Sequence, residues 1–525
     1  MFHKVRDLSK DLAIYGVGDV AVSVINFALL PIFTLILSDV DYGVLALLGA
    51  VEVVAKIVFR FGLDGSFMRF YYLYDDERDR QKLASTIFLF LLVVNAVLLA
   101  AAVLATPFAA ERLFAWNEGV SAADRTMHVR ALQLVLLNTF AISFTFFPFH
   151  LLRMQKRAAE FSLLTLARSV TTLLLRILFV LGLGHGVMGI VVADAIVTAM
   201  LLAILLRWFA PLIRPVFSRA MLRESLAFGL PRVPHAFAQQ VMAVGDRFIL
   251  PWFRSIGEIG IYSMGATFGL TQKLFLSAFE YAWAPFYYAT AREPDGQRVF
   301  AVITTYAFGT LCLMTAGLSA AGADLLALMV PAIYAPAAPV ITWTAVGVLL
   351  QGVYLLTSIG LNITKKTKYY PISTVVAAAA SISLNVALIP RFGIVGAAWA
   401  NAAAYGLQAA MAYRFSQRFY PIAYEWGRLI RVAAAALLGY LVARQLPAMS
   451  PLAGVLVRGT TVVVVTGGVL GLSGFFHAAE MEILSRLRRR SKEDAASVPP
   501  PETTEFAGEI IASDVRDDLV DKQPR

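Results

Sequence analysis

Uninterrupted apolar runs of 20 to 30 residues follow one another along almost the whole chain. A membrane-spanning helix needs about 20 predominantly apolar residues, whereas the strands of an outer-membrane barrel alternate over about ten. Of the 525 residues, 59% are hydrophobic and 15% are charged, against about 25% charged in an average soluble domain. The pattern excludes a soluble globule and predicts an all-α polytopic membrane protein.

Fourteen runs qualify as transmembrane helices. The first is too long for a signal-peptide core and is expected to stay as a span. The second and eighth are long enough to tilt, protrude or break, with Gly62 and Gly65 as flex points in the second. The predicted spans are 12–37, 42–74, 83–106, 131–152, 159–183, 186–206, 225–251, 258–289, 299–320, 339–362, 370–389, 393–413, 430–446 and 452–475.

The distribution of Lys and Arg predicts the orientation of these spans. With the N-terminus inside, the inward segments hold 27 Lys and Arg residues and the outward loops hold six. Cytoplasmic loops of membrane proteins carry such an excess. It accounts for the net charge of +10 without a nucleic-acid partner. We expect both termini to be cytoplasmic.

The two halves of the chain resemble each other. SDVDYGV (38–44) corresponds to SIGEIGI (255–261), and GVMGIVVAD (186–194) corresponds to GIVGAAWAN (393–401), which gives a repeat of about 210 residues. An even number of spans per repeat orients both copies alike, a plan used by alternating-access transporters. The predicted parts are an N-terminal lobe at 1–206 (spans 1–6), a cytoplasmic linker at 207–224, a C-terminal lobe at 225–413 (spans 7–12), an appended hairpin of spans 13 and 14 at 414–475, and at 476–525 a basic helix followed by a disordered acidic tail.

Catalytic signatures are missing from the sequence. No Gly-Lys pair of a P-loop occurs, the six histidines sit singly, and the one cysteine, Cys312, lies in an apolar run. We therefore predict a transporter rather than an enzyme, with no metal site and no cofactor. Coupling to protons or sodium through Asp19 or Glu280 is an open alternative to a cycle driven by the membrane potential.

Charged residues inside the spans are costly and mark functional sites by default. In span 2, Glu52, Lys56, Arg60 and Asp64 are spaced by four and form one stripe, which is either a ladder of ion pairs on the helix or a cavity wall. The candidate cations for an anionic ligand are Lys56, Arg60, Arg69, Arg232 and Lys273. The polar or coupling candidates are Asp19, Asn26, Glu52, Asp64, His235, Gln239 and Glu280.

Two details refine this set. In span 7, Arg232, His235 and Gln239 recur at i, i+3 and i+7 and should share one face. Arg176 and Asp194 lie at similar depth on spans 5 and 6 and should pair. Asp246 and Arg247 lie near the outer end of span 7, where they form either an interfacial pair or a ligand contact.

Four segments in order resemble the polysaccharide biosynthesis and export family: GLDGSFMRFYY (62–72), AFGLPRVPHAF (227–237), GDRFIL (245–250) and EIGIYSMG (258–265). The family is part of the superfamily that also contains lipid II flippases and multidrug extruders. The resemblance covers about 10–480 and implies two six-helix lobes around a central cavity lined by spans 1, 2, 7 and 8.

The resemblance implies a flippase that moves undecaprenyl-pyrophosphate-linked repeat units from the inner to the outer leaflet of the bacterial inner membrane, for O-antigen (lipopolysaccharide) or exopolysaccharide synthesis. Its expected partners are the lipid-linked glycan, the membrane, and the polysaccharide polymerase and export machinery. Two alternatives stay open. One is a multidrug or cation extruder of the same superfamily, and the other is a membrane glycosyltransferase or polymerase.

Overall fold

The computed structural model describes residues 27, 29–114, 121–155 and 157–476, except for the side chains of Ala158 and Trp208. Within these residues the chain is helical and has no strand. Met1–Gly467 forms one compact unit and Gly468–Arg525 a second, and the packing described below concerns the first. Ten helices of the described residues are long and apolar enough to cross a membrane, which confirms the polytopic helical class.

The helices of the first half follow the predicted runs closely. Predicted span 1 and the basic helix and tail lie largely outside the described residues. Span 2 is divided by Phe61 and Gly62, whose φ angles are 50° and 67°, so the break expected at Gly62 is confirmed. The helices are α2 (Leu30–Thr34), α3 (Asp39–Arg60), α4 (Leu63–Leu73), α5 (Glu77–Leu113), α6 (Ala122–Ser143), α7 (Phe146–Met154), α8 (Ala158–Ile177) and α9 (Gly186–Phe209).

Spans 7 and 8 are broken into shorter pieces in the second half. Prolines 231 and 251 lie in 3-10 turns that interrupt span 7, because proline lacks the donor that continues a helix. Gly393, with φ 60° and ψ −141°, separates spans 11 and 12 within α18. The helices are α10 (Arg219–Gly229), α11 (Val233–Val244), α12 (Asp246–Ile249), α13 (Ile256–Gly269), α14 (Lys273–Thr290), α15 (Gly296–Met329), α16 (Ala338–Thr357), α17 (Ile359–Ile363), α18 (Tyr369–Phe419), α19 (Trp426–Arg444) and α20 (Pro451–Leu472).

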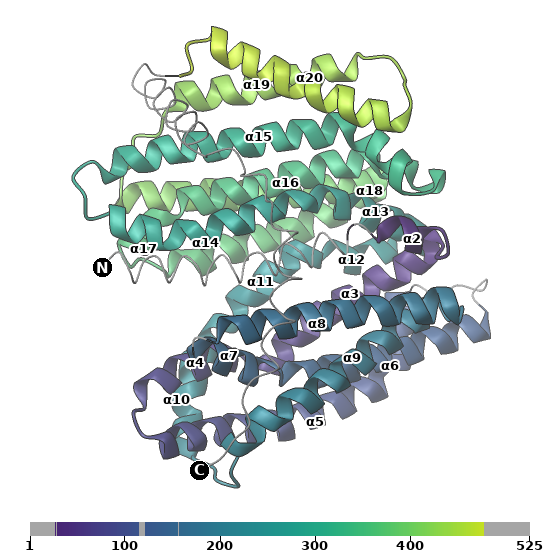
Figure 1. Ribbon diagram of the computed structural model, residues 1–525, viewed down its shortest axis with the longest axis vertical. Coiled ribbons are helices and arrows are strands. Elements are labelled where there is room, and N and C mark those ends of the chain that lie inside the picture. The colour runs from purple at the N-terminus through teal and green to yellow at the C-terminus, as the bar shows by residue number, and fades with distance from the viewer. Residues whose placement is uncertain (1–26, 28, 115–120, 156, 477–525) are drawn as a thin grey trace, which may run out of the picture. The chain divides into compact units, whose positions relative to one another are not determined.

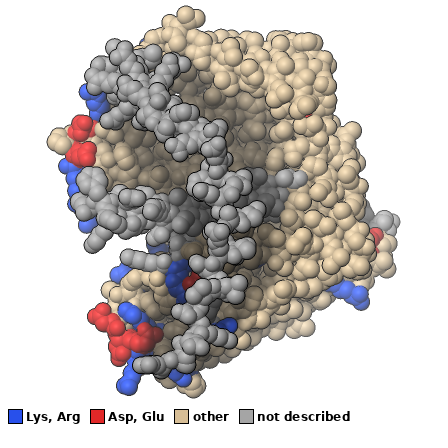
Figure 2. Space-filling model, viewed as in Figure 1, with Lys and Arg blue, Asp and Glu red and all other residues tan. Residues whose placement is uncertain are grey.

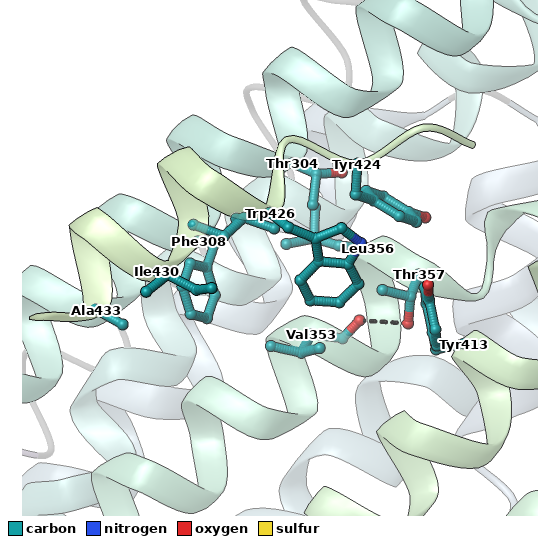
Figure 3. Close-up of a pocket in the computed structure, with 11 residues that line it drawn as sticks. Thr304, Phe308, Val353, Leu356, Thr357, Tyr413, Tyr424, Trp426, Ile430 and Ala433 are labelled. Atoms are coloured by element: carbon teal, nitrogen blue, oxygen red, sulfur yellow. Dashed lines mark hydrogen bonds between the residues drawn. The ribbon is translucent and has the colours of Figure 1, made fainter. Parts of the chain in front are cut away.

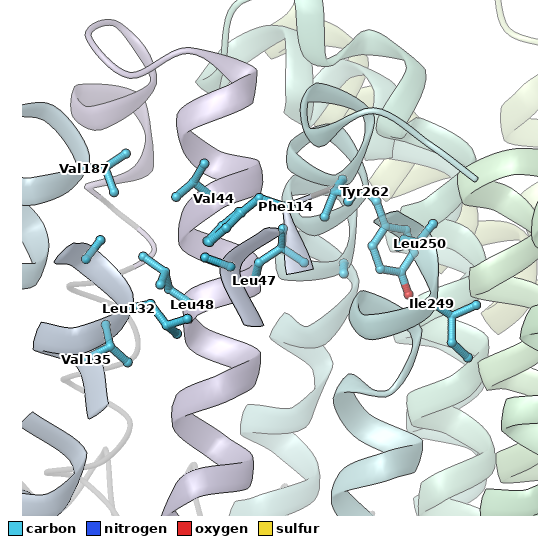
Figure 4. Packing of buried hydrophobic residues seen from close by; sticks show 14 of the residues in the cluster. Val44, Leu47, Leu48, Phe114, Leu132, Val135, Val187, Ile249, Leu250 and Tyr262 are labelled. Carbon is cyan, nitrogen blue, oxygen red and sulfur yellow. The ribbon is translucent and has the colours of Figure 1, made fainter. Parts of the chain in front are cut away.

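Helix α3 joins the two sets of helices. It packs against α5, α6 and α9 of the first half and against α11, α12 and α13 of the second (Figure 1). Its apolar face belongs to a buried cluster drawn in Figure 4. The labelled members are Val44, Leu47 and Leu48 of α3, with Phe114, Leu132, Val135, Val187, Ile249, Leu250 and Tyr262 around them.

The two corresponding motifs of the repeat begin helices in the same way and pack on each other. Ser38 and Asp41 form a capping box at the start of α3, and Ser255 and Glu258 form one at the start of α13. A Cβ atom on Gly260 would lie 1.9 Å from the Asp39 carbonyl oxygen, and one on Gly43 would lie 2.0 Å from the Ile256 carbonyl oxygen. Gly43 and Gly260 are equivalent positions of the repeat, and so are Asp39 and Ile256. Each half therefore makes the same contact with the other, as in a two-fold symmetric interface.

A second close approach lies beyond the far end of α3. A Cβ on Gly62 would lie 2.6 Å from the Gly229 carbonyl oxygen, and one on Gly229 would lie 2.7 Å from that of Gly62. The Ser66 hydroxyl donates to the Ser225 carbonyl at 2.7 Å. The halves therefore touch both at the start of α3 and α13 and between α4 and α10. Charged side chains on the face shown in Figure 2 gather mainly at its left edge, where helix ends such as those of α4 and α10 lie.

Candidate functional site

A cavity of about 640 Å³ borders the second of these contacts at Gly62. Helices α3, α4, α7 and α11 surround it, and we call it the α3–α11 cavity. The break at Gly62 and the 3-10 turn Leu230–Arg232 bring its charged residues to one place. The lining residues are Val53, Lys56, Ile57, Arg60, Gly62, Asp64, Gly65, Met68, His150, Arg232, Val233, Ala236 and Gln240.

Three of the predicted cations line this cavity, against one carboxylate. Lys56 pairs with Glu52 at 2.5 Å, a full ion pair along the helix. Arg60 Nη1 lies 3.8 Å from Asp64 Oδ2, which is too long for a hydrogen bond. The stripe on span 2 is therefore both a pair of i,i+4 contacts and a cavity wall.

Arg232 has no carboxylate within ion-pair distance among the described residues. Its guanidinium lies 5.0 Å from the ring centroid of Phe228, a cation–π contact that fixes the side chain but leaves its donors available. A Cβ at Gly65 would lie 3.3 Å from Arg232 Nη1, so α4 approaches this guanidinium closely. Among the lining residues, Arg232 is the cation best placed to bind an anion.

The remaining predicted cations lie elsewhere. Arg69 is exposed and lies 4.4 Å from the ring centroid of Phe228, but it is not among the residues that line the cavity. Lys273 and Glu280 belong to α14, which the cavity does not reach. Asp19 and Asn26 lie outside the described residues.

The face of span 7 differs from the one predicted. Val233, Ala236 and Gln240 line the cavity with Arg232, whereas His235 and Gln239 do not. A 3-10 turn advances about 120° per residue and an α-helix about 100°. The turn Leu230–Arg232 therefore rotates Arg232 relative to α11, and the simple i, i+3, i+7 pattern does not hold across it.

Sequence reasoning also missed His150. It reaches the cavity from α7, a short helix that begins after the interruption at Thr145. Span 4 carries no charge and gave no reason to point to this cavity. For a single histidine in an apolar run, the neighbouring sequence does not show whether the side chain lines a cavity or packs in the core.

A second cavity, of about 330 Å³, lies between α2, α3, α6, α8 and α9. We call it the α3–α9 cavity. The pair expected between Arg176 and Asp194 is confirmed and faces it, with two nitrogen–oxygen distances of 2.8 and 2.7 Å. Among its described lining residues, the other side chains that can form hydrogen bonds are those of Tyr42, Glu52 and Asn138.

Of the two roles expected for Asp246 and Arg247, the interfacial pair of side chains is not formed, and the Asp246 carboxylate accepts from the backbone N–H of Arg247 at 2.8 Å. Asp246 is buried, and its carboxylate accepts hydrogen bonds from the Tyr262 hydroxyl and, at 2.8 Å, from the Asn401 amide. These partners come from α13 and α18. The side chain turns inward because a buried carboxylate needs donors, and two lie across the packed helices.

An apolar pocket of about 190 Å³ lies beside α19, far along the chain from this site. Figure 3 shows its aromatic wall, with Tyr413, Tyr424 and Trp426 around Leu356 and Thr357. None of its described lining residues is charged, so it does not extend the cationic site.

Two solved membrane proteins share this helical fold. The lipid II flippase MurJ, in an inward closed conformation, superposes with a TM-score of 0.71 at 13% identity, covering 86% of this chain and 98% of that one. An inward-facing multidrug resistance MATE family transporter of the MOP superfamily gives 0.61 at 14%, covering 76% and 93%. At these identities the likeness is one of fold.

The chain belongs to the polysaccharide biosynthesis protein family, whose model matches residues 8–287. The family expected from the four sequence segments is thereby confirmed. No curated protein matches the chain.

Proposed function

We propose that this protein is a flippase that moves undecaprenyl-pyrophosphate-linked oligosaccharide repeat units from the inner to the outer leaflet by alternating access. The observation that carries the proposal is the α3–α11 cavity, where Arg232 has no ion-pair partner among the described residues and Lys56 and Arg60 line the same space. A glycan on a pyrophosphate cannot cross hydrocarbon unaided. An Arg-containing cavity offers bidentate donors for its phosphates.

The charge of the cavity favours an anion over a cation. Its described lining residues include three cations and one carboxylate, and a pyrophosphate diester brings about two negative charges. Moving those charges outward down an inside-negative potential releases roughly 5 kcal/mol per 100 mV. The proposed cycle thus needs no ATP, although coupling to protons or sodium would serve equally.

Two other functions compete with this one. A multidrug extruder of organic cations is disfavoured because its cavity would need an excess of acidic groups. A membrane glycosyltransferase or polymerase would need a catalytic constellation beside the glycan. The proposed role is transport without catalysis, for O-antigen or exopolysaccharide synthesis together with a polymerase and export machinery.

Reconstitution tests the function directly. We expect proteoliposomes holding the protein and the lipid-linked glycan from cells that lack it to expose the glycan to an external glycosidase faster than empty vesicles do. Equal rates in both vesicles would contradict flipping. Export of ethidium without glycan exposure would support the extruder, and new glycosidic bonds would support the transferase.

Topology is tested independently. With both termini in the cytoplasm of a bacterial inner membrane, reporter fusions after Lys82, Lys156, Arg219 and Lys368 should read cytoplasmic, because these positions follow the Lys- and Arg-rich segments. Fusions near Gly119 and Ala335 should read periplasmic. Two or more reporters on the wrong side of the membrane would contradict the predicted number and orientation of the spans.

A further inference from the structure

One face of α3 lines both polar cavities. Residues three or four apart share a helix face, and the distance along the axis from Gly49 to Arg60 is about 16 Å at 1.5 Å per residue. Glu52 lines the α3–α9 cavity and its ion-pair partner Lys56 lines the α3–α11 cavity, so this pair joins the two. The residues along the face are Tyr42, Leu45, Gly49 and Glu52 in the first cavity, then Lys56 and Arg60 in the second.

The two cavities differ in charge. In the α3–α9 cavity the carboxylate of Asp194 is paired with Arg176 through two hydrogen bonds, and that of Glu52 is paired with Lys56. The described residues therefore leave no unpaired charge there, whereas Arg232 is unpaired in the α3–α11 cavity. A neutral polar ligand suits the first cavity and an anion suits the second.

Asn138 supplies the second indication. Its side chain lines the α3–α9 cavity, is only 9% exposed, and has an amide oxygen with no hydrogen-bond partner among the described residues. Leaving a buried acceptor unpaired is costly. A ligand hydroxyl would give the Asn138 amide a partner, and the paired carboxylates of Glu52 and Asp194 keep free lone pairs for further hydroxyls.

We propose that the α3–α9 cavity binds sugar residues of the lipid-linked substrate while the α3–α11 cavity binds its pyrophosphate. This inference rests on the proposed flippase function and names a second, glycan-recognising part of the site. The cavity of about 330 Å³ has mainly apolar and aromatic walls, including Phe33 and Tyr42, with a few polar groups, as small-molecule sites do. The glycan lies along α3, and the hydrogen-bonding groups around Asn138 select it by its hydroxyls.

The test compares two lipids that differ only in the glycan. The probes are undecaprenyl pyrophosphate and the undecaprenyl-pyrophosphate-linked glycan purified from cells that lack the protein. Asn138→Leu keeps the side-chain volume and removes the hydrogen bonds. We expect it to weaken binding of the glycan-bearing lipid about tenfold and to leave binding of the bare lipid unchanged. Arg232→Ala should weaken binding of both.

Asn362→Leu is the matched control, because Asn362 hydrogen-bonds to Tyr287 and lines neither cavity. It should leave both affinities at the wild-type values. Thermal midpoints in detergent show whether each variant is folded, and Asn138→Thr is measured in the same way should Asn138→Leu not fold.

The outcomes separate the two proposals. If Asn138→Leu binds the glycan-bearing lipid as tightly as wild type, or weakens both lipids equally, the sugar site is overturned and the flippase function stands. If the wild-type protein binds neither lipid, the proposed function itself fails.

Discussion

Arg232→Ala should abolish glycan export while the protein stays folded. The guanidinium has no carboxylate partner among the described residues and is fixed only by Phe228 and the approach of α4, so its loss leaves no buried carboxylate unpaired. Removing a charged partner of a ligand typically costs 2–5 kcal/mol, which is about 30-fold to 5,000-fold in dissociation constant. The measurements are surface glycan in cells and affinity for undecaprenyl pyrophosphate with purified protein.

Arg207→Ala is the control for this variant, since Arg207 is exposed at the end of α9 and lines neither cavity. It should export at the wild-type rate. Wild-type affinity of Arg232→Ala for undecaprenyl pyrophosphate would contradict the pyrophosphate site.

Substitutions of Arg60 distinguish a role in ligand binding from a role in stabilising the helix. Its contact with Asp64 is 3.8 Å long and about one-third exposed, so we expect Arg60→Ala to change the free energy of unfolding by less than about 1 kcal/mol and yet to abolish export. Arg60→Lys should recover export only in part, because a point charge replaces a two-pronged donor. The double variant Arg60→Ala with Asp64→Ala is the decisive case. If it restores export, Arg60 serves only to pair with Asp64 and does not bind the ligand.

Gly260→Val should prevent α3 and α13 from closing on each other and should thereby stop transport. A Cβ at this position would lie 1.9 Å from the Asp39 carbonyl oxygen and 2.9 Å from the Gly43 backbone nitrogen. Backbone atoms of a helix cannot turn aside as a flexible side chain can, so the helices must separate. Overpacking of this kind typically costs 1–3 kcal/mol or more.

The separation can be measured with spin labels at Val40 and Phe253, which are both exposed, in a Cys312→Ser background. We expect a longer distance in Gly260→Val, together with a lower thermal midpoint and little surface glycan. Gly317→Val is the matched control, because a Cβ there meets nothing within 4 Å. An unchanged label distance in Gly260→Val would show that this contact does not limit closure.

The sequence by itself determined those features that depend on local chemistry. Apolar runs predict helices because a membrane leaves backbone groups no other partner. The break at Gly62 follows from the freedom of glycine at positive φ. The pair of Arg176 and Asp194 could be predicted because two opposite charges at similar depth on adjacent spans have few other partners.

Only the tertiary structure decided which side chains meet across helices. Gln240 and His150 line the α3–α11 cavity while Lys273, His235 and Gln239 do not. The Asp246 carboxylate accepts from the side chains of Tyr262 and Asn401 rather than from the Arg247 guanidinium. Three residues of 3-10 turn alter the rotation of a helix by about 60°, enough to move a residue from one face to the next. Such rotations, and contacts between residues more than a hundred positions apart, are set by how whole helices pack, and no local pattern in the chain records them.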